Sequence, residues 1–175
     1  MHLATFLEEM GEKPTCLKKL DMEENNFYHV VPSVIAKAFN KLEHLELKPN
    51  PATTSQQIIA ILQLMAKQTN IVCLKFTYEN ISWLNPGLVA RAVVQVEQVD
   101  MMCKMSGAHI KAVLSNLNQN SRTKRLNLGC NDVSKIPGKV LRSAVEVLRN
   151  NGGTVIVPQI KGKKYLRYSS LPASN

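Results

Sequence analysis

The feature that most constrains the fold is an apolar pattern that recurs three times along the chain. Each copy opens on an apolar residue or a threonine, and further apolar residues follow three, five and ten positions later. The copies begin at Leu17, Ile71 and Thr123. A proline and a second apolar segment follow each copy at a similar distance, at Pro32, Pro86 and Pro137. Self-similarity of this kind is typical of repeat architectures, in which each unit packs on its neighbours.

Two further copies of the first part of the pattern lie between these three. They begin at Leu42 and Val96 and are followed by different apolar segments. The units therefore start near 17, 42, 71, 96 and 123, and pairs of units recur every 52 to 54 residues. The chain thus alternates a short and a long repeat.

Each unit is expected to form a short strand, a turn and a returning helix. In the first unit, Leu20 and Met22 point to one face of a strand and Asp21 and Glu23 to the other, because strand side chains alternate. Asn25, Asn50 and Asn131 occupy the turn, where side-chain amides can bond to the backbone of neighbouring coils. Glu79 and Lys104 stand at that position in the two remaining units, so this asparagine ladder is expected to be broken in the middle.

The second half of each unit has the spacing of an amphipathic helix. Prolines at the first helical position fit this assignment, because their missing N–H would have no partner there. Thr54 or Ser55, Asn85 and Ser106 are the expected N-caps. A strand side and a helix side closing over one shared core predict an α/β fold.

The pattern L-x-x-L-x-L-x-x-N stands at 17–25, at 42–50 and, with threonine leading, at 123–131. It resembles the leucine-rich repeat proteins of the ribonuclease-inhibitor-like subclass and is similar to the repeat domains of NOD-like receptors. The resemblance implies a horseshoe-shaped solenoid with short parallel strands on the concave face and helices on the convex face. It places a repeat domain at 1–157, with partial terminal units, and leaves 158–175 as a basic C-terminal tail.

Members of this family are typically protein-recognition modules. The resemblance therefore implies a non-catalytic protein–protein interaction module, with innate-immune sensing or signalling as its setting and no cofactor. No phosphate-binding loop, GxSxG, HExxH or paired acids beside a histidine occur in the sequence, so an enzyme is not expected. The expected state is a monomer or one part of a longer array.

The candidate partner-binding residues are the strand residues that flank the buried apolar positions, since these face outward on the concave side. The simplest alternative is that they only solvate an exposed sheet. Glu24, Lys48, Cys73 and Gln98 flank the same positions. The predicted contact residues are Lys19, Asp21, Glu23, His44, Glu46, Lys75, Thr77, Tyr78, Asp100, Met102, Arg125 and Asn127.

A different function is suggested by the basic tail. The net charge of the chain is +9, and the tail interleaves cations with Tyr165 and Tyr168, a combination that could grip phosphates and stack bases. The alternative prediction is therefore nucleic acid or an acidic surface as the partner, while a purely solubilising tail remains the simpler reading. The tail cations are Lys161, Lys163, Lys164 and Arg167.

Four cysteines are widely spaced, at Cys16, Cys73, Cys103 and Cys130. This spacing matches neither a zinc site nor a dense disulfide framework, and the histidines have no metal-ligand partners at suitable spacing. No apolar leader and no stretch long enough to cross a membrane is evident. The sequence therefore predicts a cytoplasmic protein without a metal.

Overall fold

Every strand of the sheet lies beside the strand that follows it in the sequence. The computed structural model describes residues 3–20, 27–48, 53–78, 80–157 and the backbone of 166–168. Strands β1 to β5 run parallel to one another, and β6 is antiparallel to β5. The strands are β1 (His44–Leu47), β2 (Cys73–Phe76), β3 (Gln98–Met101), β4 (Arg125–Asn127), β5 (Thr154–Val157) and β6 (Leu166–Tyr168).

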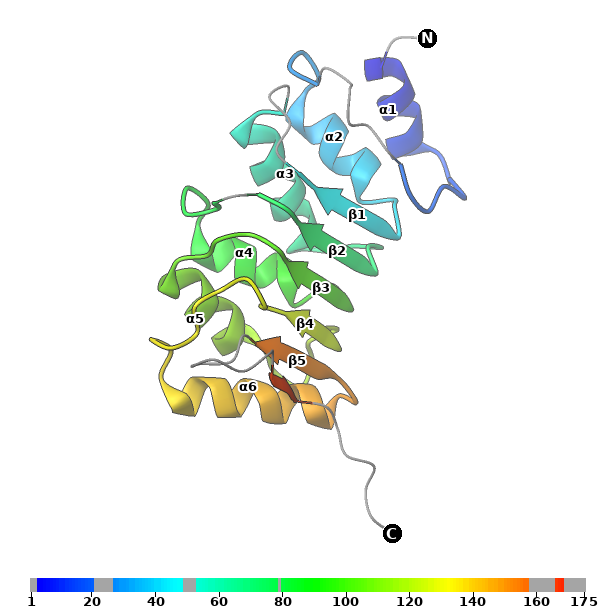
Figure 1. Ribbon diagram of the computed structural model, residues 1–175. Helices are drawn as coiled ribbons and strands as arrows, with labels where there is room; N and C mark the ends of the chain where they lie inside the picture. Colours follow the sequence, from blue (N-terminus) through cyan, green and yellow to red (C-terminus); the bar gives the residue numbers. More distant parts are fainter. Residues whose placement is uncertain (1–2, 21–26, 49–52, 79, 158–165, 169–175) are drawn as a thin grey trace.

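The helices form a second layer on one side of this sheet (Figure 1). Helix α2 packs extensively on both α1 and α3, as α4 does on α5, whereas the contacts of α3 with α4 and of α5 with α6 are less extensive. The helices are α1 (Leu3–Glu12), α2 (Pro32–Phe39), α3 (Ser55–Met65), α4 (Pro86–Val93), α5 (Gly107–Asn116) and α6 (Gly138–Asn150).

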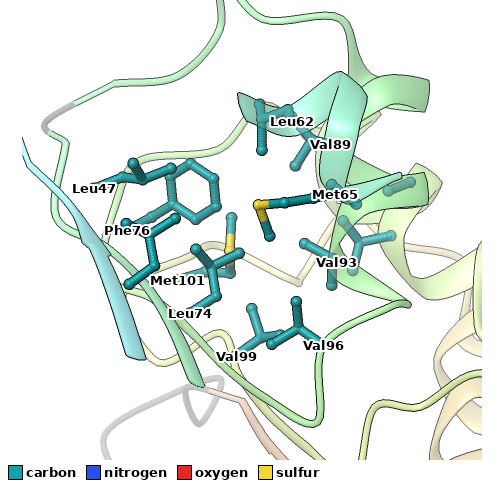
Figure 2. Close-up of a cluster of buried hydrophobic side chains, with 14 of the residues drawn as sticks. Leu47, Leu62, Met65, Leu74, Phe76, Val89, Val93, Val96, Val99 and Met101 are labelled. Atoms are coloured by element: carbon teal, nitrogen blue, oxygen red, sulfur yellow. The ribbon is translucent and has the colours of Figure 1, made fainter. Parts of the chain in front are cut away.

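The hydrophobic core fills the space between the two layers. Alternate strand residues, such as Leu74 and Phe76 on β2, point toward the helices and are buried. Helical side chains such as Met65 and Val93 meet them from the other side (Figure 2). The intervening strand residues face away from the helices, so one face of the sheet is free of helices.

The predicted units correspond to the observed strands. The units that start near 42, 71, 96 and 123 supply β1 to β4, and β5 lies at the end of the repeat domain expected at 1–157. In the first unit only a parallel bridge between Lys19 and His44 is described, because residues 21–26 lie outside the described residues. The architecture is α/β with a parallel sheet, which is compatible with the expected solenoid.

The helix starts follow the predicted capping chemistry. The side chains of Thr54, Asn85 and Ser106 each accept a hydrogen bond from a backbone N–H in the first turn of α3, α4 and α5, which confirms the expected N-caps. Pro86 is the first residue of α4, as predicted. Pro137 corrects the prediction, because it is the N-cap of α6 and the helix begins at Gly138.

Two glycines make the turn from α6 into β5. Gly152 has a φ of 69°, in the left-handed region that glycine adopts without strain. At Gly153 a β-carbon would collide with the backbone carbonyl of Lys124, which directly precedes β4. The pair of glycines therefore allows β5 to approach β4 closely.

The asparagine ladder is present in only one place among the described residues. Asn131 donates to Met101 O at 3.1 Å and accepts from Met105 N at 2.8 Å, so it bonds to the preceding coil as predicted. Between β1 and β2, the hydroxyl of Thr77 donates instead to Leu47 O at 3.2 Å. Asn25 and Asn50 lie outside the described residues.

Two buried polar side chains tie helices to the preceding repeat. Gln57 of α3 donates to Phe27 O at 2.7 Å and Val30 O at 2.8 Å. His109 of α5 has its Nε2 atom 2.9 Å from Leu84 O, in the corresponding loop. Both residues stand three positions after their N-cap, at equivalent places in the two-unit repeat.

The sheet continues past the boundary that the sequence placed at 157. Residues 166–168, within the predicted tail, form β6 and pair with β5. Among the described residues, no helix is both long enough and apolar enough to cross a lipid bilayer.

Candidate functional site

The helix-free face of the sheet carries two rows of side chains that cross the strands, one on each side of a buried apolar row. We call these the first row and the second row. The first row consists of Lys19, His44, Cys73, Gln98 and Arg125, which are neighbours by register. The second row consists of Glu46, Lys75, Asp100 and Asn127. Both rows follow from strand alternation, because residues two positions apart share a face.

The second row is held by interactions between neighbouring strands. The ammonium group of Lys75 lies 3.0 Å from the carboxylate of Glu46. The amide of Asn127 donates to Asp100 Oδ1 at 2.7 Å, and its oxygen accepts from Gly129 N at 2.9 Å. Each of these side chains therefore has a fixed partner and a restricted orientation.

A hollow of about 250 Å³ lies over these rows, across β1 to β4. Its floor is the strand backbone at Leu45, Leu74 and Val99, whose side chains point into the core, and mostly polar side chains of the two rows border it. The hollow brings together seven of the twelve predicted contact residues, namely Lys19, His44, Glu46, Lys75, Asp100 and Arg125 on its lining, with Asn127 bonded to Asp100 beside it.

Cys73 lies near the centre of the first row with a half-buried side chain. Burial raises the pKa of its thiol, the charge of Glu97 raises it further, and Arg125 opposes the shift. The thiol is therefore protonated at neutral pH and contributes a small uncharged group to the hollow.

Three predicted contact residues lie beyond the strand ends and do not line the hollow. Thr77 bonds to Leu47 O, and Met102 is 46% exposed. Tyr78 is half-buried against Trp83, with ring centroids 6.4 Å apart, and this burial raises its pKa. These residues belong to the loop edge rather than to the two rows.

Several predicted binding residues fall outside the described part of the chain. Asp21 and Glu23 are among them, as are the tail residues Lys161, Lys163 and Lys164. Arg167 is in β6, opposite Ile156, where only the backbone is described.

Sequence reasoning missed two ion pairs between residues that directly precede the first row. Lys18 lies 3.2 Å from Glu43, and Lys124 lies 3.0 Å from Glu97. The sequence contains the signal for both pairs. Each of the four residues directly follows the first position of its unit, and in each pair one of two adjacent units has a lysine there and the other a glutamate. Among the described residues, no cluster of three or more His, Cys, Asp or Glu side chains is arranged to hold a metal ion.

Comparison of the chain with protein-family models, with curated proteins and with solved structures finds no match.

Proposed function

We propose that this chain is a leucine-rich repeat solenoid that works as a non-catalytic interaction module and binds a protein partner through the first and second rows. The observation that carries the proposal is the hollow over β1 to β4, which is bordered by polar and charged side chains on consecutive strands. Polar and charged groups that match those of a partner give a protein interface its specificity.

The size and shape of the hollow favour a macromolecular partner over a small molecule. Its volume of about 250 Å³ is below the roughly 300–1,000 Å³ of typical small-molecule pockets. It also extends across four strands, or about 14 Å from β1 to β4 at a strand spacing of about 4.8 Å. A protein surface or an extended segment fits such a shape.

The rigidity of the second row also supports the proposal. Glu46 and Lys75 hold each other in place, and Asn127 holds Asp100. Side chains that are ordered before binding lose little conformational entropy when a partner arrives. Binding of a partner that fits this face would therefore cost little side-chain entropy.

The test compares a substitution on this face with a matched one on the helix side. Lys75→Glu places a third acid beside Glu46 and Asp100, so it removes one ion pair and changes the charge of the hollow. Lys111→Glu changes the same charge on the exposed side of α5. Proteins captured from native cells with each tagged chain are quantified, and both variants are checked for unchanged urea unfolding.

A genuine partner is recovered with the unsubstituted chain and with Lys111→Glu, and its recovery falls at least about tenfold with Lys75→Glu, equivalent to about 1.4 kcal/mol. Equal recovery with all three chains would refute binding through the two rows. Loss of every partner on replacement of Lys161, Lys163, Lys164 and Arg167 by Gln would point instead to the basic tail.

A further inference from the structure

The two carboxylates that line the hollow are both engaged within this chain. Glu46 lies 3.0 Å from Lys75, and Asp100 accepts from Asn127 at 2.7 Å. Just before the strands, Glu43 is paired with Lys18 at 3.2 Å and Glu97 with Lys124 at 3.0 Å. The negative charge around the hollow is therefore largely satisfied without a partner.

Two cations at the ends of the first row are not engaged in this way. Lys19 and Arg125 both line the hollow, and both side chains are exposed. Within the described ranges, neither makes an ion pair or a side-chain hydrogen bond. A free guanidinium and a free ammonium group are the donors that bind carboxylates most strongly.

The part of the first row between these two cations carries no acid. His44, Cys73 and Gln98 present an imidazole, a thiol and an amide. Desolvation of Cys73 keeps its thiol protonated, so it does not add negative charge. The first row therefore has a cation at each end and three side chains without negative charge between them.

From this charge pattern we infer that the first row binds an extended acidic segment of the protein partner, running across the strands with one carboxylate at Lys19 and another at Arg125. The inference rests on the proposed function. Four strand spacings of about 4.8 Å separate the two cations by about 19 Å, and an extended chain advances about 3.3 Å per residue. The two acids of the partner are therefore about six residues apart.

A nucleic acid fits this pattern less well than an acidic peptide. Each strand of a DNA duplex carries a negative charge about every 3.4 Å. Phosphates between the two cations would lie over the uncharged centre and close to Glu46 and Asp100. Two carboxylates at the ends of a neutral segment match the positions of the free cations without this repulsion.

The experiment is a selection from a displayed library of random twelve-residue peptides on the full chain. The double variant Lys19→Gln/Arg125→Gln removes both charges of the row. The matched control Arg91→Gln/Lys111→Gln removes two charges from exposed positions on α4 and α5. Affinities of the enriched peptides are then measured for the three chains by fluorescence anisotropy.

The expected enriched peptides carry two acids five to seven positions apart, in keeping with the spacing of about six. They bind the control like the unsubstituted chain, and they lose at least about tenfold in affinity for the double variant, since each substitution removes a charged donor to a carboxylate. No enrichment, or enrichment without this acid spacing, would overturn the inference.

The outcomes separate this inference from the proposed function. Enriched peptides that lack the acids but lose affinity with Lys75→Glu would overturn the acidic segment and leave binding through the two rows intact. Peptides insensitive to every substitution on this face would count against both. A labelled twenty-nucleotide single strand that binds as tightly as the peptides, and with the same dependence on Lys19 and Arg125, would overturn the assignment of the partner as a protein.

Discussion

His109 is a buried imidazole that has a partner at each ring nitrogen. Its Nε2 lies 2.9 Å from Leu84 O, a carbonyl that can only accept, so the proton resides on Nε2. Its Nδ1 lies 2.7 Å from the hydroxyl of Ser106, which then donates to it. The side chain thereby joins the start of α5 to the loop that precedes α4.

Removal of this side chain is expected to destabilise the fold. His109→Ala leaves Leu84 O without its partner and lowers the free energy of unfolding by about 1–3 kcal/mol, measured by urea unfolding. His109→Gln lowers the free energy of unfolding by less, because Gln57 shows that a side-chain amide can donate to the equivalent loop. The exposed His44→Ala is the control and changes stability by less than about 0.5 kcal/mol. Similar losses for His109→Ala and His44→Ala would show that His109 is not a structural link.

Cys103 is expected to make stability depend on alkaline pH. Burial, with a smaller contribution from Cys130, raises the pKa of its thiol from 9.0 to about 12. Between these pH values the native thiol keeps its proton while the unfolded thiol loses it, so stability is complete below pH 9 and falls as the pH rises toward 12. The urea midpoint should fall less between pH 8 and 10.5 in Cys103→Ala than in the unsubstituted chain.

The exposed Cys16→Ala is the comparison for this experiment and should keep the unsubstituted pH dependence. If the urea midpoint of Cys103→Ala fell as much between pH 8 and 10.5 as that of the unsubstituted chain, the pH dependence would come from groups other than Cys103.

At this scale, strand alternation predicted the residues of both rows, because the side-chain period of a strand is fixed by its backbone. The hydrogen bonds of His109 were not predictable from its neighbours in sequence. They depend on a carbonyl 25 residues away, which only the stacking of repeats brings close. The same holds for Tyr78, whose contact with Trp83 moves it away from the hollow.

Helices α2 and α4 occupy equivalent places in the two-unit repeat but begin with different caps. Val31 is the N-cap of α2, with φ −58° and ψ 131°, and makes no side-chain bond. Asn85 is the N-cap of α4, with φ −71° and ψ 122°, and accepts from Leu88 N at 3.0 Å. The backbone geometry at Val31 is therefore already suitable for an asparagine.

Exchange of these caps gives a prediction for each helix. Val31→Asn should raise the free energy of unfolding by about 1 kcal/mol, and Asn85→Val should lower it by about the same amount. Val31 is 59% exposed, so little apolar burial is lost. Val31→Ala is the control and should give no gain, and a gain as large as that of Val31→Asn would exclude capping as the cause.

The element boundaries were predictable where local chemistry determines them. The caps at Thr54, Asn85 and Ser106 were found because serine, threonine and asparagine bond to free N–H groups of the first turn. The start of α6 was predicted one residue too early. Proline can occupy either the N-cap or the first helical position, and the residues around Pro137 do not distinguish the two.

At the scale of the whole molecule, β6 covers the edge of the sheet that β5 would otherwise expose. Its antiparallel pairing joins Val155 with Tyr168 and Val157 with Leu166. A strand without a neighbour presents free N–H and C=O groups, which favour pairing between molecules. The sequence did not predict this cover, because three residues between polar segments carry too little pattern.

Truncation after residue 157 should therefore cause self-association and lower the unfolding midpoint, measured by size-exclusion chromatography with light scattering and by thermal unfolding. Truncation after residue 168 retains β6 and is the matched control. A monomer of unchanged stability after the first truncation would show that the edge of β5 needs no cover.

The uneven packing of the helices has a consequence for how the molecule opens. The sheet is continuous, but the helix layer divides into α1 to α3, α4 with α5, and α6 alone. Separation of two neighbouring groups breaks fewer helix–helix contacts than separation of two helices within one group. Opening therefore proceeds in blocks rather than one helix at a time, and amide hydrogens within a block exchange with solvent together. The bonds of Gln57 and of His109 each join elements of one block, so they strengthen the blocks rather than the junctions between them.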